Sequence, residues 1–397
     1  MIDTGTKAFW RATLALCLGS FMIFSNLYMT QPLLPTFVKT FGISELQASW
    51  SFTVATLTLG LSLLIYGPLS DAFGRKNIMM LSMGGVVLTT FLLSQTSDYS
   101  ALVVLRGVQG FCLGGLPAIA IAYMGDEFKR EAMVMAVGFY ISGNSIGGIG
   151  GRLIGGFVGE WLGWSEVFLV MTLVGFCLLL VFAFLLPTSQ HFEPKPMSPK
   201  KMLSAMYVHL TTPLLIIAYL IGGFNFFIFI NQYSFVTFLL AAEPYHLSPS
   251  WLGMLFLTYL SGTVGSAVSG RAAQRWPQPV CMMLGIFFLM IGSLVTLIPS
   301  IWAILVGFLI NAFGFFFAHS TASSWVSQNA QQAKATASSL YLVFYYLGAS
   351  SGGFYLQPFW KSAGWQGVIF GSMLVLLMTL GLSALLYKLS RKAGVYV

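Results

Sequence analysis

Two arginines, Arg106 and Arg152, lie inside apolar stretches that are long enough to cross a lipid bilayer. An arginine at the centre of a membrane helix costs about 2.5–3.5 kcal/mol on insertion scales, so it needs a buried partner or a water-filled cavity. None of the 11 acidic residues falls inside such a stretch. The two guanidinium groups therefore predict a polar site for an anionic or polar neutral solute. For Arg106 an alternative stays open, because a side chain only about six residues from one end of its stretch can also extend to the membrane surface.

Other polar side chains in the apolar stretches would complete this site. His319 is the only histidine among them, and it could carry a coupling proton, because histidine changes its charge roughly between pH 5 and 8. A hydrogen-bonded contact between helices is the alternative for His319, and about half of the uncharged polar residues should have that role. The predicted substrate and coupling site consists of Asn26, Arg106, Gln109, Asn144, Arg152, Asn225, His319 and Tyr345.

Glycines recur every four residues in one stretch, at Gly143, Gly147, Gly151 and Gly155. This spacing leaves one face of a helix almost bare, so that a neighbouring helix can approach closely. We therefore assign these four residues to helix packing. The four cysteines lie in apolar runs at no metal-ligand spacing, so we expect small buried side chains, no metal site and no cofactor.

The composition indicates the elements that must position these residues. The chain is 57% hydrophobic and only 8% charged, whereas soluble domains carry about 25% charged residues. Lipid must therefore be the solvent for most of the chain. We expect an all-α integral membrane protein, with spans near residues 10–38, 46–67, 77–95, 101–123, 132–158, 165–186, 211–240, 250–270, 279–298, 301–324, 334–358 and 365–388.

The basic residues predict the orientation of these spans. If both termini are cytoplasmic, the inner segments hold fifteen of the 19 Lys and Arg residues and the outer loops hold only Lys39 and Lys361. The positive-inside rule then places both termini in the cytoplasm. The net charge of +8 would face anionic lipid headgroups, and we expect no nucleic-acid partner.

Residues 187–209 differ from the spans, because they contain four prolines and three lysines. We predict a cytoplasmic linker here, between a six-helix bundle in residues 1–186 and a second bundle in residues 210–397. The halves repeat faintly at an offset of about 200, as in Leu105-Arg106-Gly107 and Leu305-Val306-Gly307. Transporters built from repeats bind their substrate between them, near the middle of the membrane.

The segment Gly67-Pro68-Leu69-Ser70-Asp71-Ala72-Phe73-Gly74-Arg75-Lys76 packs three charges close together after the second span. An ion pair in so tight a loop can lock two helices together, although an ordinary basic turn is the alternative. The segment resembles the signature loop of the major facilitator superfamily, and the layout of six plus six spans extends the resemblance to the whole chain. The resemblance implies a cytoplasmic gate formed by Gly67, Asp71, Gly74, Arg75, Lys76 and Asp126.

Two further segments resemble motifs of the same superfamily. Arg106 and Gly110 resemble an arginine motif that is linked to proton coupling, and the glycines of the fifth span resemble a motif of drug:proton antiporters. Packing alone would also explain the glycines, and the Pro of the family motif is replaced here by Asn144-Ser145. The second half keeps only Arg271 and Arg275 of the loop motif.

We therefore predict a secondary transporter of the cell inner (cytoplasmic) membrane, a monomer that exports an anionic or polar neutral compound in exchange for protons by alternating access. Multidrug efflux of lipophilic compounds and proton-coupled uptake remain alternatives, and outside transport a membrane sensor remains open. An ATP-driven pump is disfavoured because the nucleotide-binding pattern GxxxxGK[ST] is missing. A membrane enzyme is disfavoured because no cluster of His, Asp or Glu lies near one membrane face.

Overall fold

The computed structural model describes residues 1–194 and 199–394. Within these residues the chain is helical apart from short connections, and its only β-type contact is an isolated bridge between Ile2 and Phe128. The contacts divide it into two compact units, one of Met1–Ser198 with Leu247–Met254 and the other of Pro199–His246 with Leu255–Val397. The segment 247–254 thus belongs to the first unit although it follows in sequence after helices of the second.

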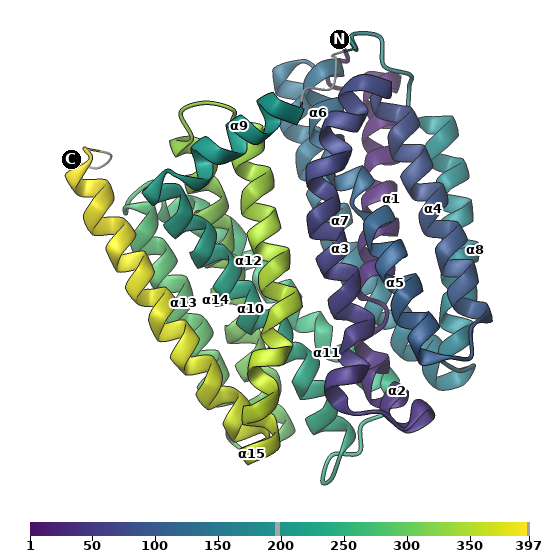
Figure 1. Ribbon diagram of the computed structural model, residues 1–397, viewed down its shortest axis with the longest axis vertical. Helices are drawn as coiled ribbons and strands as arrows, with labels where there is room; N and C mark the ends of the chain where they lie inside the picture. The colour runs from purple at the N-terminus through teal and green to yellow at the C-terminus, as the bar shows by residue number, and fades with distance from the viewer. Residues whose placement is uncertain (195–198, 395–397) are drawn as a thin grey trace. The chain divides into compact units, whose positions relative to one another are not determined.

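Among the described residues, the first unit holds the helices α1 to α8, which Figure 1 labels, together with a short 3₁₀ turn. They are α1 (Lys7–Tyr28), the 3₁₀ turn η1 (Gln31–Leu33), α2 (Leu34–Phe41), α3 (Glu45–Phe73), α4 (Arg75–Gln95), α5 (Tyr99–Leu113), α6 (Gly115–Glu127), α7 (Arg130–Trp161) and α8 (Trp164–Leu185). Side-chain caps begin several of them: Asp98 accepts from the amide of Ala101 at 2.8 Å, and Ser44 forms a capping box with Gln47.

α11 (Pro249–Leu255) lies in the first unit except for its last residue, and the second unit contains the remaining elements. They are α9 (Pro199–Leu210), α10 (Pro213–Ala241), η2 (Phe256–Thr258), α12 (Tyr259–Ala272), α13 (Gln278–Val295), α14 (Ile301–Asn329) and α15 (Lys334–Lys392). Residues 187–209, the predicted linker, divide between the two units. Residues 187–194 lie in the first unit without regular structure, α9 belongs to the second, and residues 195–198, with Lys195, lie outside the described residues.

The helices confirm the predicted all-α membrane fold. Within residues 1–194 and 199–394, eleven helical stretches are long and apolar enough to cross a membrane. The last of them, α15, contains two predicted spans, because Ala363 and Gly364 leave helical geometry. Tyr355 Oη donates to the carbonyl of Gly371 at 3.1 Å, so the chain turns back on itself there. The twelve predicted spans thus correspond to the observed helices, with ends that differ by a few residues.

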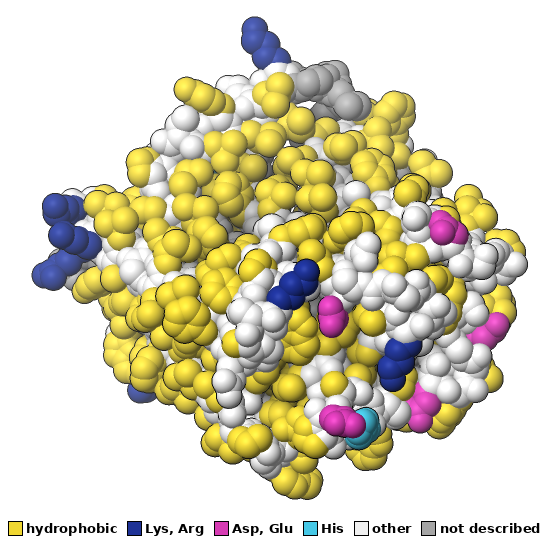
Figure 2. All heavy atoms as spheres, turned by 60° about the horizontal axis from the view of Figure 1, so that its bottom comes forward, with side chains coloured by type: hydrophobic (Ala, Val, Ile, Leu, Met, Phe, Trp, Pro, Cys, Tyr) yellow, Lys and Arg dark blue, Asp and Glu magenta, His cyan; other side chains and the backbone are white. Residues whose placement is uncertain are grey.

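Large apolar side chains cover the outside of the helices. Leu81, Val104 and Phe184 are between 66% and 77% exposed. Figure 2 shows one face, on which hydrophobic side chains dominate and charged ones are few. A surface of this kind is stable against lipid hydrocarbon and not against water.

The first span is broken in the middle of its sequence. α1 ends at Tyr28, and the chain continues through η1 into α2. Pro32 and Pro35 have no amide hydrogen, so they cannot continue the hydrogen-bond ladder of α1. Because α1 ends at Tyr28, its last carbonyls have no amide in helical register and are left for other donors.

Candidate functional site

Arg106, on α5, is fully buried in the first unit. Its Nε donates to the carbonyl of Ser51 at 2.7 Å, and its Nη1 and Nη2 donate to the carbonyls of Asn26 and Leu27 at 3.0 and 2.8 Å. Nη1 also donates to the side-chain oxygen of Gln109. The alternative in which Arg106 extends to the membrane surface is therefore wrong, because the guanidinium is 0% exposed and faces four protein oxygens.

These bonds give Arg106 a structural effect on α1. The carbonyls of Asn26 and Leu27 belong to the last turn of α1, where no amide follows in helical register. A guanidinium satisfies them and places positive charge at the negative end of the helix dipole. Arg106 thus holds the broken end of the first span.

The side chains of Asn26, Thr90 and Gln109 form a hydrogen-bonded triad beside the Arg106 guanidinium. The Asn26 side-chain oxygen accepts from Thr90 Oγ1 at 3.0 Å and from Gln109 Nε2 at 3.4 Å, and Gln109 Nε2 also donates to Thr90 Oγ1 at 2.6 Å. The three residues come from α1, α4 and α5 and are all buried. Sequence reasoning selected Asn26 and Gln109 but missed Thr90.

Arg152, on α7, contacts the same end of α1 through different groups. Its guanidinium lies 3.9 Å from the centre of the Tyr28 ring, and its Nε donates to Gln31 Oε1 at 2.7 Å. Its Nη1 donates to the carbonyl of Gly148 at 3.0 Å, and the side chain is 1% exposed. The two buried arginines therefore converge on residues 26–31.

The four glycines selected for packing place α7 against the backbone of α1. A Cβ on Gly143, Gly147, Gly151 or Gly155 would meet a carbonyl oxygen of α1 or of the residue after it at 2.4, 2.6, 2.2 or 2.1 Å. Any side chain there would force the helices apart. Asn144, on the next helical position, is only half-buried.

In the second unit, His319 on α14 lies in an aromatic cluster. Its Nδ1 lies 2.9 Å from the hydroxyl of Tyr341, and its ring stacks on Phe315 with centroids 5.7 Å apart. The Tyr345 ring is 4.7 Å from His319 and stacks on Phe226 at 3.7 Å. The predicted residues His319 and Tyr345 are thus brought together, with Tyr341 as a partner that sequence reasoning missed.

A second polar triad lies in this unit, on α10, α13 and α14. Gln232 Oε1 accepts from Ser293 Oγ at 3.0 Å and from Asn311 Nδ2 at 2.8 Å, and Asn311 Nδ2 also donates to Ser293 Oγ at 3.0 Å. It repeats the arrangement of Asn26, Thr90 and Gln109. Gln232 Nε2 and Asn311 Oδ1 have no protein partner, and neither has the side chain of the predicted residue Asn225.

The triads give the structural register of the repeat on α5 and α14. Gln109 corresponds to Asn311, so the position of Arg106 corresponds to Phe308, which is buried. Val306, the residue that matched Arg106 in sequence, is 49% exposed. The second half therefore has an aromatic ring where the first has a guanidinium.

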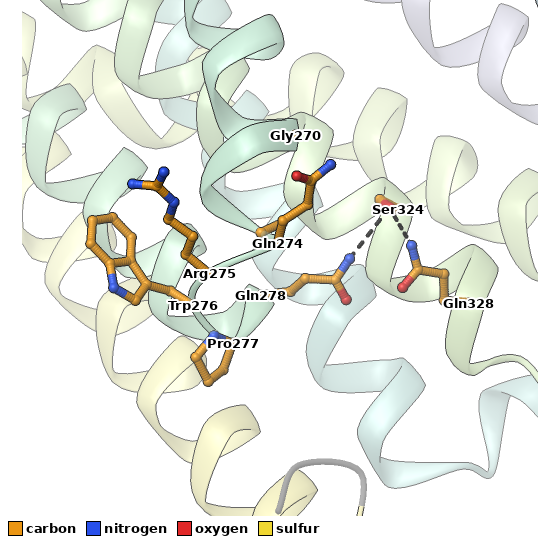
Figure 3. A pocket seen from close by; sticks show the side chains of 9 residues that line it. Gly270, Gln274, Arg275, Trp276, Pro277, Gln278, Ser324 and Gln328 are labelled. Carbon is orange, nitrogen blue, oxygen red and sulfur yellow. Dashed lines mark hydrogen bonds between the residues drawn. The ribbon is translucent and has the colours of Figure 1, made fainter.

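The loop after α12 carries what remains of the charged motif in the second half. A pocket of about 500 Å³ lies beside it, and its lining includes Gln274, Arg275 and Trp276 (Figure 3). Arg275 is exposed, and none of the ion pairs found among the described residues includes it. This loop therefore keeps an arginine of the motif, but not the ion pairs that the motif forms in the first half.

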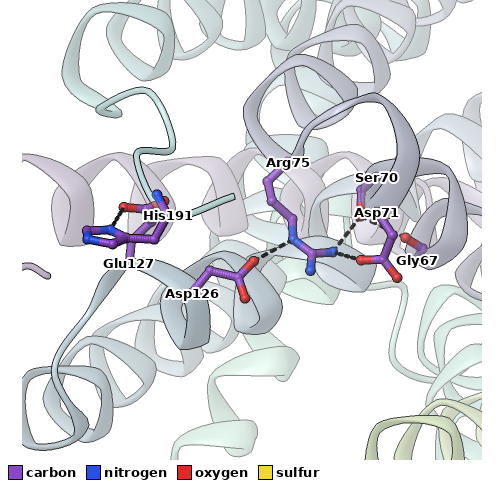
Figure 4. A network of polar contacts seen from close by, with 7 residues as sticks. All are labelled: Gly67, Ser70, Asp71, Arg75, Asp126, Glu127 and His191. Atoms are coloured by element: carbon purple, nitrogen blue, oxygen red, sulfur yellow. Dashed lines mark hydrogen bonds and ion pairs between the residues drawn. The ribbon is translucent and has the colours of Figure 1, made fainter. Parts of the chain in front are cut away.

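The corresponding loop of the first half is a compact charged cluster, formed by Asp71, Arg75 and Asp126 (Figure 4). Arg75 forms ion pairs with Asp71, one turn earlier, and with Asp126 on α6, to which its Nε donates at 2.9 Å. Its Nη1 also donates to Ser70 Oγ at 2.9 Å. The cluster thus joins the α3–α4 connection to the end of α6.

Two other motif residues position this cluster. Gly74 has φ of +100°, a conformation that an L side chain rarely adopts, so it allows the sharp turn between α3 and α4. Gly67 offers its carbonyl to Ser70 Oγ at 2.8 Å. Lys76 points elsewhere, to the end of α8, where it donates to the carbonyls of Ala183 and Leu186 at 2.9 and 2.5 Å.

Comparisons with known proteins agree with this architecture. The family model described as Major Facilitator Superfamily matches residues 16–353. The chain belongs to the major facilitator superfamily. It is 34% identical to the inner membrane transport protein YnfM of Escherichia coli over 96% of this chain and 91% of that one. It is 34% identical to the MFS-type transporter YybF of Bacillus subtilis over 98% of this chain and 96% of that one. The fold resembles a crystal structure of the peptide transporter POT, with a TM-score of 0.77 and 18% identity over 94% of each chain.

As a superfamily member, the protein is a multi-pass membrane protein that transports a solute. Its eight predicted substrate and coupling residues divide between the two units, with five in the first and Asn225, His319 and Tyr345 in the second. Sequence reasoning missed the partners that serine, threonine and tyrosine provide, because such residues are common in membrane helices.

Proposed function

We propose that this protein exports an anionic or polar neutral compound in exchange for protons, and that its two six-helix halves, residues 1–186 and 210–397, alternate about a central site. The observation that carries the proposal is the distribution of charge. All eleven acidic residues lie in described parts of the chain, at helix ends or in connections, whereas Arg106 and Arg152 are buried inside spans. A buried cationic surface without midspan carboxylates favours anions over lipophilic cations.

The arginines have different roles in this proposal. Arg106 donates hydrogen bonds to the carbonyls at the end of α1. It therefore holds that end in place and couples it to movement of α5. Arg152 holds its guanidinium against the Tyr28 ring and Gln31 Oε1, at the end of the same helix, and we assign it the contact with the substrate's acidic or polar group. Asn26, Gln109 and Asn144 complete the first half of the site, and Asn225, His319 and Tyr345 the second.

The charged cluster serves as the cytoplasmic gate. Arg75 holds Asp71 and Asp126 in the closed gate, Gly67 and Gly74 shape the turn, and Lys76 fixes the end of α8. The surplus of Lys and Arg on this side supports a position of both termini in the cytoplasm. The glycine face of α7 supports exchange with protons, through its resemblance to antiporters.

A second candidate function is efflux of lipophilic aromatic compounds. The aromatic cluster around His319 favours it, because Phe226, Phe315 and Tyr345 would stack on a planar ligand. The two candidates differ in which half of the site dominates recognition.

The test is counterflow into proteoliposomes with an imposed pH gradient, screened over organic anions, sugars and cationic dyes. We expect an anion or a sugar to accumulate when the gradient is present, and we expect Arg152→Ala to abolish this accumulation. Arg130→Ala, which removes an exposed arginine from the start of the same helix, should transport like wild type. Movement of dyes alone would instead support the second candidate, and equal transport by Arg152→Ala would contradict the role of that residue.

A further inference from the structure

Glu127 is the one buried acidic residue of the chain, and no motif includes it. Its side chain is 4% exposed, whereas each of the other ten acids is at least partly exposed. It follows Asp126 directly at the end of α6, so neighbouring residues hold the charged cluster and a second group. A buried carboxylate is costly unless it is hydrogen-bonded, so the group that satisfies Glu127 is held firmly.

That group is His191, in the irregular segment after α8. The backbone amide of His191 donates to Glu127 Oε1 at 2.9 Å, and its ring Nδ1 lies 3.1 Å from Glu127 Oε2 (Figure 4). Both oxygens of the buried carboxylate therefore bind the same residue. The main-chain bond restrains the path of the segment, and the ring bond restrains its side chain.

Residues 187–194 are bound to the gate at further points. Tyr123 Oη, one turn before Glu127, donates to the carbonyl of Pro187 at 2.9 Å. The Phe192 ring lies 6.0 Å from the Arg75 guanidinium. We call residues 187–194 the strap, because they run from α8 across the cluster toward the second half of the chain.

We propose that the strap is a part of the gate, docked on it by Glu127 through His191. This rests on the proposed function in one respect, namely that the cluster of Asp71, Arg75 and Asp126 acts as a gate. The strap then links the state of the gate to the chain that leads into the second half. His191 and Glu127 are positioning residues, since neither touches the substrate.

The test is hydrogen–deuterium exchange of the full-length protein in lipid nanodiscs, read on peptides that cover residues 187–194. Glu127→Ala and His191→Ala should speed exchange of the strap by about tenfold, the factor that corresponds to 1.4 kcal/mol. Glu127→Gln and His191→Asn keep a hydrogen bond without the titratable group, so they should stay closer to wild type. Glu193→Ala removes an exposed acid of the same segment and is the matched control.

Wild-type exchange in both alanine variants would overturn the docking, as would an equal effect of Glu193→Ala. No substrate is needed, so a failure here leaves the transport assay unaffected, and a failure of transport leaves this result unaffected.

Discussion

At the scale of single residues, the buried arginines illustrate how a costly charge is kept inside a membrane. Arg106 donates to three backbone carbonyls and one amide oxygen, so its charge is spread over neutral dipoles rather than paired with a carboxylate. The carbonyls of Asn26 and Leu27 need donors because α1 ends at Tyr28, so that no amide follows them in helical register. The same hydrogen bonds thus satisfy both the buried guanidinium and the carbonyls at the end of α1.

Replacement of Arg106 should therefore damage stability before it damages recognition. In Arg106→Ala the carbonyls of Asn26 and Leu27 lose their donors, and each unsatisfied buried group costs about 1–3 kcal/mol. We expect a lower Tm in detergent, measured by intrinsic fluorescence. Arg106→Lys should also be less stable, since an ammonium cannot reach the same set of oxygens. An unchanged Tm in Arg106→Ala, with Arg130→Ala as control, would contradict this role.

The Asp3–Lys129 pair predicts a pH dependence at the N-terminal segment. The Lys129 ammonium donates to Asp3 Oδ2 at 2.5 Å and lowers the pKa of that carboxyl below its ordinary value of 3.8, and the same bond raises the pKa of Lys129 above its ordinary value of 10.5. Because the pKa of Asp3 is lowered, its carboxylate stabilises docking at pH values above the ordinary pKa, and this stabilisation is lost as pH falls through the folded pKa. Because the pKa of Lys129 is raised, its contribution is lost only as pH rises through its folded pKa.

Docking of residues 1–6 should thus be constant near neutral pH and weaken in acid. A nitroxide label on Thr4→Cys, read by electron paramagnetic resonance, should become more mobile as pH falls below about 4. Asp3→Asn should be mobile at neutral pH already. A label whose mobility is the same at pH 3 and pH 7 would show that the pair does not hold the segment.

At the scale of elements, the contact between α7 and α1 depends on a face without side chains. Gly143, Gly147 and Gly151 lie against carbonyls of α1 that are themselves four residues apart, at Cys17, Phe21 and Ser25. Two straight helices can stay this close only if one presents no Cβ along the whole contact. The same contact brings Arg152 to the end of α1.

Alanine substitutions at two glycines of α7 should therefore have opposite effects on thermal stability. Gly151→Ala would place a Cβ 2.2 Å from the carbonyl oxygen of Ser25, so we expect a clear loss of thermal stability and of transport. Gly138→Ala, on the same helix, meets no atom within 4 Å. It should raise helix stability by about 0.5–1 kcal/mol. Equal Tm changes in the two variants, measured side by side, would show that the approach of the helices is not limited by these atoms.

At the scale of the whole molecule, the charge pattern predicts an orientation. A green fluorescent protein fused after the last residue should fold and fluoresce if that end is cytoplasmic, whereas alkaline phosphatase fused at the same position should be inactive. Both reporters should reverse when fused within the connection near Asp98, on the side expected to be outside. Active phosphatase at the C-terminus would refute the positive-inside assignment.

The spans and the fold class could be predicted from sequence because a membrane helix must satisfy its own backbone and be about 20 apolar residues long. That condition is local, so it is visible in the chain. The break in α1 is also local, as Pro32 and Pro35 show, although its consequence for Arg106 is not. The turn inside α15 lies where two spans were expected to meet, because Gly364 adopts φ of +54° there.

The sequence by itself determined that this protein lies in a bilayer, which superfamily it resembles, and which few charges are buried. Only the tertiary structure decided what the two buried arginines hold. Arg106 turned out to be bound by backbone carbonyls of α1, and backbone atoms carry no signal in the amino-acid sequence. The pairing of Glu127 with His191, 64 residues apart, likewise depends on how α6 packs beside the chain after α8. Partners of this kind are selected by proximity in space, and one chain read in order contains no measure of that proximity.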